Sequence, residues 1–195
     1  EHLLIDRALK ESDIKKLINQ IKWWKNYTQI NGGSLDNNPS PGNKKGGLTT
    51  ILEKSLGAVA KSGNSTMINV LDYAEKISEK GFHFMDSPGY DPVSVTGQVA
   101  SGSNLICFTT GRGSCFGFKP TPSLKISSNT NMYNNLEEDM DINAGTIMDG
   151  IHSIEEIGTK IFNELIEVAS GKKTKSEINE YGDDEFNPWV IGATM

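Results

Sequence analysis

The densest group of ligand-binding residue types in this sequence is the stretch Thr109, Thr110, Gly111, Arg112, Gly113 and Ser114. Glycines on both sides of Arg112 let the backbone approach a ligand closely, and the guanidinium is a planar fork that matches a carboxylate or a phosphate. Hydroxyl side chains beside it can bind the hydroxyl groups of a polyol. The stretch therefore predicts a site for a small polyhydroxylated anion. A tight turn with a solvated arginine is an equally good interpretation of the spacing alone, because Gly-x-Gly without a following helix is a weak signal.

A second polar segment, residues 38–50, is rich in proline, glycine and asparagine and contains Asn43. Thr50 and Glu53 have the spacing of a capping box, which predicts that a helix begins there. We prefer this capping role for Glu53 over a catalytic one. Lys54 has no comparable structural role, so it is the better candidate for a catalytic cation.

His83 and Asp86 belong to a third candidate region. His83 lies within the apolar run 82–85, which predicts a short strand, and Asp86 follows directly after it. The preferred interpretation of His83 is a core histidine bonded to a backbone carbonyl, and proton transfer is the alternative. The carboxylate of Asp86 can bind hydroxyl groups or supply an oxygen ligand to a metal. No His or Cys pair in the sequence has the spacing of a zinc site.

Two amphipathic helices are predicted near the ends of the chain, over residues 10–31 and 153–171, because apolar residues recur there every three to four positions. We expect the first helix to begin near Ser12 and Asp13, and the second at the capping box of Ser153. Both helices are interpreted as scaffold. The intervening residues 38–150 carry the motifs.

Short apolar runs between these helices predict strands, at residues 82–85, 105–108, 124–126 and 140–142. A helix over 93–100 is expected between the first two strands, since Asp91-Pro92 is a typical helix start. Strand, helix, strand at this spacing is a βαβ unit, so we predict an α/β, Rossmann-like layered fold with a mainly parallel sheet and flanking helices. Ligands bind beyond the carboxyl ends of such strands. The polar segments expected there are residues 86–89, 109–114 and 127–130.

The composition limits the classes of function. The chain has 195 residues, a net charge of -6 and two cysteines, Cys107 and Cys115. Its acidity argues against nucleic acid as a partner, and no apolar run is long enough to span a membrane. Two cysteines outside any CxxC pair favour reduced thiols and a cytoplasmic location. Because the first residue is Glu1 and not Met, we expect a fragment of a longer chain.

Three long stretches resemble the family of altronate and galactarate dehydratases, namely NPSPGNKKGGLTTILEKSLG, FHFMDSPGYDPVSVTG and CFTTGRGSCFGFKPTPSLKISSNT. DMDINAG and FNPWVIGA extend the resemblance, which covers the C-terminal domain of the family almost from end to end. One departure is Ala58, where several family members have a cysteine.

The resemblance implies that residues 1–195 are a single C-terminal-type domain of a hydro-lyase, which dehydrates a sugar acid to a 2-keto-3-deoxy acid with Fe2+ or Mn2+. The implied partners are a sugar-acid substrate and the missing N-terminal domains or a partner subunit, and a homo-oligomer is left open. Two alternatives remain: a sulfolactate sulfo-lyase, which belongs to a sister group, and a non-catalytic binding or assembly domain.

Dehydration next to a carboxylate needs a group that holds the carboxylate, a base for the proton on the adjacent carbon, and groups that orient the polyol. We hypothesise that Arg112 and the backbone of residues 113 and 114 hold the carboxylate, and that Lys54 or His83 is the base. Asp86 is the candidate metal ligand. The remaining residues expected to bind the substrate are Asn43, Thr109, Thr110, Gly111, Gly113, Ser114 and Lys119.

Overall fold

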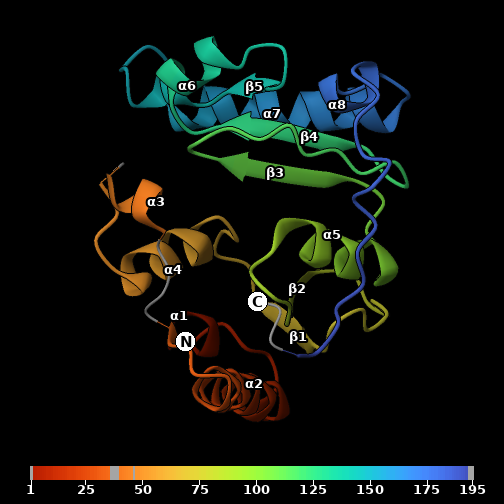
Figure 1. The fold of residues 1–195 in the computed structure, drawn as a ribbon. Helices are drawn as coiled ribbons and strands as arrows, with labels where there is room; N and C mark the ends of the chain where they lie inside the picture. Colours follow the sequence, from red (N-terminus) through yellow and green to blue (C-terminus); the bar gives the residue numbers. More distant parts are fainter. Residues whose placement is uncertain (1, 36–39, 46, 193–195) are drawn as a thin grey trace. The chain divides into compact units, whose positions relative to one another are not determined.

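The computed structural model describes residues 2–35, 40–45 and 47–192 of the chain. The chain divides into two compact units, one formed by residues 1–87 with 191–195 and the other by residues 88–190. Figure 1 labels the helices and strands of both units. That residues 1–195 together make one domain of a larger enzyme stays a prediction.

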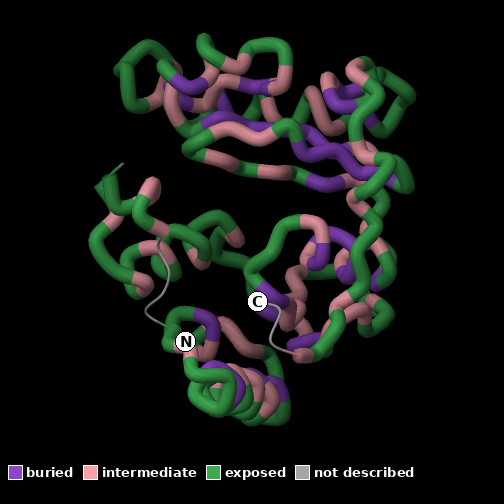
Figure 2. The backbone as a smooth tube through the Cα atoms, in the orientation of Figure 1, coloured by how far each residue is buried: buried purple, intermediate pink, exposed green. Residues whose placement is uncertain are grey.

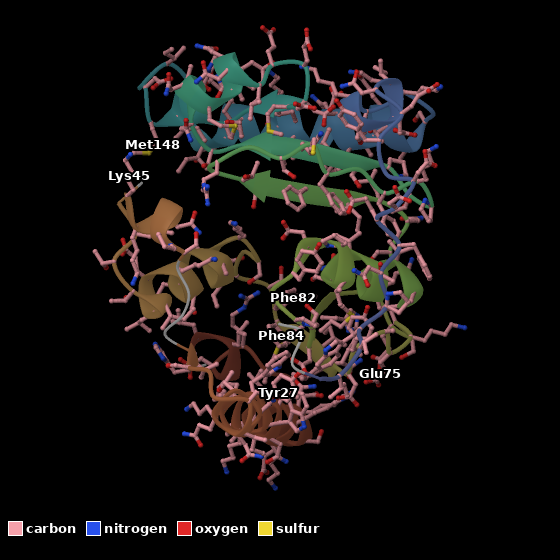
Figure 3. The ribbon with its side chains drawn as sticks, in the orientation of Figure 1. Tyr27, Lys45, Glu75, Phe82, Phe84 and Met148 are labelled. Carbon is pink, nitrogen blue, oxygen red and sulfur yellow. The ribbon has the colours of Figure 1, made fainter. Side chains whose placement is uncertain are left out.

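The first unit contains mainly helices and a small parallel sheet. Strand β1 (Met67–Leu71) pairs in parallel with β2 (Phe82–Met85). Phe82 and Phe84, labelled in Figure 3, pack from β2 against the core of this unit. The described helices of the unit are α1 (His2–Ile5), α2 (Glu11–Ile30), α3 (Pro41–Lys45) and α4 (Ile51–Ala60).

The first predicted helix is confirmed as α2, which begins at Glu11, next to the predicted start near Ser12 and Asp13. The N-cap position is Lys10, and no side chain caps the helix there. Asp13 is buried instead, and its Oδ1 accepts a hydrogen bond of 3.1 Å from the backbone N–H of Val70 in β1. The carboxylate has this long-range partner, so it ties α2 to β1 instead of capping the helix.

The second unit contains a three-stranded parallel sheet in the order β3-β4-β5. The helix expected over 153–171 is confirmed as α7, whose capping box joins Ser153 and Glu156. Figure 2 shows that β4, the central strand, is buried along its length. The elements of this unit are α5 (Asp91–Ala100), β3 (Ile106–Thr110), β4 (Ser123–Ser127), α6 (Thr130–Asn135), β5 (Ile142–Asn143), the 3-10 helix η2 (Gly145–Ile147), α7 (Ile154–Ala169) and α8 (Lys175–Ile178).

The two faces of this sheet differ in chemistry because side chains alternate along a strand. On one face Leu124, Ile126 and Ile142 form a core with Val168 of α7. On the other face Ile106 of β3 packs with aromatic side chains of the segment that follows β3, and the central position of β4 is a lysine. The sheet therefore has one face that is apolar along β4 and β5, and one face that mixes aromatic and polar residues.

The α/β class, with parallel sheets and flanking helices, is confirmed, whereas the expected βαβ unit is not formed. β2 and β3 flank α5 in the sequence, but β2 pairs with β1 and β3 pairs with β4. Strand β1, the hydrogen-bonding partner that β2 requires, was not among the predicted strands. Cys107 lies in the apolar run 105–108, a position that favours burial as a small apolar residue, but β3 is an edge strand and the residue is exposed. In the described part of the chain, no helix is both long and apolar enough to cross a bilayer.

Candidate functional site

The carboxyl ends of the three strands in the second unit form one edge. Thr110, Ser127 and Asn143 are the last residues of β3, β4 and β5, and they are aligned in register across the parallel sheet. Three segments continue the chain from this edge, namely residues 111–114, 128–130 and 144–147. We call these segments and the three strand ends together the carboxyl edge. Two of the segments predicted to bind a ligand thus lie side by side.

Hydrogen bonds join the arginine loop to the segment after β4. The side-chain amide of Asn129 donates to the carbonyl of Gly111 at 2.8 Å, and the N–H of Ser128 donates to the carbonyl of Thr110 at 3.0 Å. Asn129 also caps α6, because its Oδ1 accepts from the N–H of Met132 at 2.8 Å. A single asparagine therefore fixes both the loop and the start of the helix.

The loop around Arg112 is a tight turn that the side chain of Thr110 stabilises. The Oγ1 atom of Thr110 accepts hydrogen bonds from the N–H groups of Gly113 at 3.1 Å and Arg112 at 3.3 Å. Gly113 has a φ of +90°, a conformation that favours glycine, and a Cβ there would overlap the side chain of Leu136. The turn leaves the Arg112 side chain on the exposed surface of the unit.

A third segment, after β5, completes the carboxyl edge. Asn143 donates from Nδ2 to the hydroxyl oxygen of Thr130 at 3.1 Å and accepts at Oδ1 from the N–H of Gly145 at 2.9 Å. The Thr130 hydroxyl donates to the carboxylate of Asp149. Gly145 lies so close to Asn129 that only a residue without Cβ fits. Thr130 belongs to the predicted segment 127–130, whereas Asn143, Gly145 and Asp149 were not predicted from the sequence, although Asn143 follows a predicted strand.

Lys125 is the residue that the sequence analysis missed. Its side chain is 0% exposed in the centre of β4, and its Nζ has no hydrogen-bond partner among the described residues. Nζ lies 5.8 Å from the ring centroid of Tyr181. Burial lowers the pKa of Lys125, while the carboxylates of Asp139 and Asp141 raise it in part. The available signal was a lysine between Leu124 and Ile126 in a run otherwise interpreted as apolar.

Some predicted substrate-binding residues of this unit are not brought to the carboxyl edge. Lys119 lies in the connection that returns to the amino end of β4, where Pro122 accepts a hydrogen bond from the first residue of β3, Ile106. The Nζ atom of Lys119 forms an ion pair of 2.5 Å with a carboxylate oxygen of Asp183. Lys119 is therefore at the opposite edge of the sheet from Arg112. Thr109 alternates with Thr110 and so faces the opposite side of β3.

The other predicted residues lie in the first unit. His83 is bonded through Nε2 to the carbonyl of Glu79 at 2.9 Å, so the expected backbone partner is present, but the residue is only half-buried and does not belong to the core. Since a carbonyl only accepts, Nε2 carries the proton; the buried Nδ1 has no hydrogen-bond partner among the described residues. Lys54 lies on α4 and Asn43 on α3. Residues 38 and 39 of the polar segment are outside the described residues.

Asp86 does not lie in a metal-binding cluster. Its Oδ1 accepts a hydrogen bond of 2.7 Å from the indole of Trp24. Burial raises the pKa of Asp86, and the bond from Trp24 opposes this rise. Within residues 2–35, 40–45 and 47–192, no group of three or more His, Cys, Asp or Glu side chains is placed to hold a metal ion. The described residues therefore do not fit a metal centre.

A parallel sheet whose carboxyl edge carries an arginine loop, hydroxyls and amides defines an α/β protein with a polar edge suited to a small anionic ligand. Residues 1–194 match the family described as D-galactarate/Altronate dehydratase, C-terminal, and the chain belongs to this family.

The curated relatives are longer enzymes. The chain is 44% identical over 172 residues to galactarate dehydratase (L-threo-forming) of Escherichia coli (strain K12), which covers 88% of this chain and 33% of that protein. It is 37% identical over 197 residues to altronate dehydratase of Bacillus subtilis (strain 168), covering 100% and 39%. It is 33% identical over 143 residues to (2R)-sulfolactate sulfo-lyase subunit beta of Chromohalobacter salexigens, covering 73% and 37%. The chain thus spans between a third and two fifths of the length of these relatives.

Proposed function

We propose that the carboxyl edge binds the carboxylate end of a sugar acid, and that the chain is the C-terminal part of a sugar-acid dehydratase. The observation that carries this proposal is the convergence of the Arg112 loop with Asn129 and Asn143 at the ends of three parallel strands. Membership of the galactarate and altronate dehydratase family supplies the reaction class.

The chemistry of dehydration explains why an arginine is needed there. A base removes the proton from the carbon next to the carboxylate. The hydroxyl group on the neighbouring carbon takes up a proton from an acid, such as the protonated base, and leaves as water. The resulting enol tautomerises to a 2-keto-3-deoxy acid. Negative charge builds on the carboxylate oxygens as the proton leaves. The fork of Arg112 matches two carboxylate oxygens, and a charge-assisted bond of this kind contributes about 1.5–3 kcal/mol. The hydroxyl and amide groups of the edge would orient the polyol.

Two roles lie outside this proposal. The assignment of Lys54 or His83 as the base stays a hypothesis from the sequence. The requirement for Fe2+ or Mn2+ also stays a prediction for the full-length protein, since the described residues contain no cluster that fits the ion.

The proposal is tested with Arg112→Met and Arg112→Lys in the full-length protein. Loss of about 1.5–3 kcal/mol corresponds to a fall in kcat/KM of about 10- to 150-fold in Arg112→Met. Arg112→Lys keeps the charge but lacks the fork, so we expect only partial recovery. Lys15→Met is the matched control, because Lys15 is an exposed cation on α2 that pairs with Glu11. Unchanged turnover in Arg112→Met would remove Arg112 from this role.

The product assay separates the alternatives. Formation of a 2-keto-3-deoxy acid from galactarate or altronate supports the proposal. Release of sulfite from sulfolactate, with no dehydration of either sugar acid, contradicts it and favours the sulfo-lyase. Binding of sugar acids without turnover in the full-length protein favours a binding domain.

A further inference from the structure

Dehydration at the carboxyl edge requires a base, and the two residues considered for this role from the sequence lie in the other unit. Lys54 and His83 belong to the first unit, and the unprotonated ring nitrogen of His83, Nδ1, is buried. The hydroxyl and amide side chains of the carboxyl edge are hydrogen-bonding groups and not bases at neutral pH. A base carried by the same unit as Arg112 must therefore be a carboxylate, an imidazole or an amine next to this edge.

Asp149 supplies a carboxylate at this place. It lies two residues after η2, in the segment that continues from β5, and it is exposed. Its Oδ2 accepts the hydrogen bond from the hydroxyl of Thr130 at the start of α6, whereas Oδ1 has no hydrogen-bond partner in the described part of the chain. Met148, the preceding residue, is labelled in Figure 3 at the end of the sheet toward which the β3 arrow points in Figure 1. Asp149 thus has one oxygen held by the protein and one oxygen open to a ligand.

Two neighbouring residues fix the orientation of this carboxylate. Asn143 accepts at Oδ1 from the N–H of Gly145 at 2.9 Å, which directs its Nδ2 toward the Thr130 hydroxyl oxygen at 3.1 Å. Since that oxygen receives a hydrogen from Asn143, the hydrogen of the Thr130 hydroxyl points to Asp149. A base whose position is fixed by a further hydrogen-bonding group is the usual arrangement for proton transfer in an active site.

The same contacts place Asp149 near the Arg112 loop. Thr130 follows Asn129, whose side-chain amide donates to the carbonyl of Gly111 at 2.8 Å. Neighbouring strands are about 4.8 Å apart, so the segments after β3 and β5 start about 10 Å from each other, with the end of β4 between them. A carboxylate that Arg112 binds above the end of β4 therefore has its adjacent carbon between Arg112 and Asp149.

We propose that Asp149 is the catalytic base of this dehydratase site. The inference rests on the proposed function, because it requires that Arg112 binds the carboxylate of the sugar acid. Oδ1 of Asp149 takes the proton from the carbon next to that carboxylate, so a C–H bond breaks, an O–H bond forms, and the electron pair moves toward the carboxylate. Protonated Asp149 then gives the proton to the hydroxyl group of the next carbon. This group leaves as water, and the Asp149 carboxylate is restored.

The first test is Asp149→Asn in the full-length protein. The amide keeps an oxygen that can accept from Thr130, but it is not a base. With galactarate or altronate, whichever the wild type dehydrates, we expect kcat to fall about 10²–10⁴-fold and KM to change by less than about threefold. Asp184→Asn is the matched control and should keep the wild-type kcat. Asp184 is an exposed carboxylate of the same unit, next to the Asp183 that pairs with Lys119 at the opposite edge.

The pH profile and chemical rescue separate a base from a structural residue. Because a base must be ionised, kcat/KM of the wild type should fall toward acidic pH, and this fall should be absent from the residual activity of Asp149→Asn. Asp149→Ala leaves space for a small carboxylate. Added formate should raise the kcat of this variant by about tenfold or more, in proportion to its concentration.

Three results would overturn the assignment of Asp149. The first is turnover of Asp149→Asn close to that of the wild type. The second is an unchanged acidic fall in Asp149→Asn together with no response of Asp149→Ala to formate, since the residue would then only connect Thr130 to the segment after η2. The third is loss of the acidic fall in His152→Gln and not in Asp149→Asn, which would assign the role to His152 on the same segment.

These results differ from a failure of the proposed function. In all three the wild type dehydrates a sugar acid and Arg112→Met is impaired. A wild type that dehydrates neither galactarate nor altronate, or an Arg112→Met variant with unchanged turnover, would instead contradict the proposed function on which the role of Asp149 rests.

Discussion

At the scale of single residues, Lys125 has the least ordinary environment of the second unit. A buried ammonium group without a hydrogen bond is unfavourable, because it has lost its hydration without a full replacement. The cation contact with Tyr181 and the carboxylates of Asp139 and Asp141 compensate for this loss only in part. The lysine therefore lies in the core at a net energetic cost, which stability alone does not explain.

Replacement of Lys125 by methionine is expected to leave the free energy of unfolding unchanged or to raise it. Methionine has a similar length and no charge, and exchanges of buried charges for apolar residues are often stabilising by about 1–4 kcal/mol. Urea unfolding of wild type and Lys125→Met at neutral pH is the measurement. A clear loss of stability would contradict this view, since it would show that the carboxylates and Tyr181 more than balance the burial.

The pH dependence of the same two proteins gives an independent check. Because the pKa of Lys125 is lowered in the folded state, the unfolded chain binds this proton more tightly, and stability must rise as the pH increases through the lowered value toward about 10.5. Wild type should gain stability relative to Lys125→Met over this alkaline range. Lys15→Met, on the exposed surface of α2, should follow wild type.

At the scale of elements, the carboxyl edge depends on close backbone packing between the segments after β4 and β5. Gly145 lies against the backbone of Asn129 and Thr130, where neighbouring atoms are not the ends of flexible side chains. The start of α6 and the segment after β5 must move apart if a side chain is added. This contact also holds Asn129, which supports the arginine loop.

Gly145→Ala is therefore expected to destabilise the protein by about 1–3 kcal/mol, the usual range for inserting an extra methyl group into a packed site. Thermal or urea unfolding measures the change. Gly57→Ala is the matched control, because Gly57 lies within α4 with nothing near its Cβ, and alanine should stabilise that helix by up to about 1 kcal/mol. If Gly145→Ala were as stable as wild type, the close packing described for this edge would be wrong.

Local patterns predicted these elements well where their signals are short-range. The capping box of Ser153, the helix start at Asp91 and the run 82–85 each became the expected element. The convergence of residues 109–114 with 127–130 was also predictable, since the carboxyl ends of parallel strands share an edge. The pairing of the strands was not predictable, because a run of apolar residues does not indicate which other strand it will pair with.

Individual site residues show the same limit. The burial of Lys125 was not predictable from the sequence, because a lysine in a strand next to isoleucine normally points to solvent. The sequence places Asp13 near the start of a helix, but its carboxylate accepts a hydrogen bond from the distant backbone N–H of Val70. Lys119 is close to Arg112 in sequence, yet the chain crosses the whole length of a strand between them. Residue types predicted the chemistry of the site, whereas long-range contacts determine which residues lie in it.

At the scale of the whole molecule, two separate stretches of the chain contribute to the first unit, and one continuous stretch forms the second. The chain leaves the first unit after residue 87, forms the second, and returns to the first at residue 191. The returning segment is held by Tyr27, whose hydroxyl donates to the carbonyl of Gly192 and accepts from the N–H of Gly192 at 3.1 Å. Tyr27 is itself fixed in α2, with its ring stacked on that of Trp23 at 4.7 Å between centroids.

Tyr27→Phe removes both hydrogen bonds and leaves the stacked ring in place. Each lost bond is expected to cost about 0.5–1.5 kcal/mol, so the segment at Gly192 should open more often without unfolding of the sheet in the second unit. Amide hydrogen exchange is the measurement, and we expect faster exchange at Gly192 by about 5- to 150-fold for the two bonds together, with unchanged exchange in β4. Trp23→Phe serves as the control, since it alters the stack but keeps the hydroxyl. Equal protection of Gly192 in wild type and Tyr27→Phe would show that other contacts hold the returning segment.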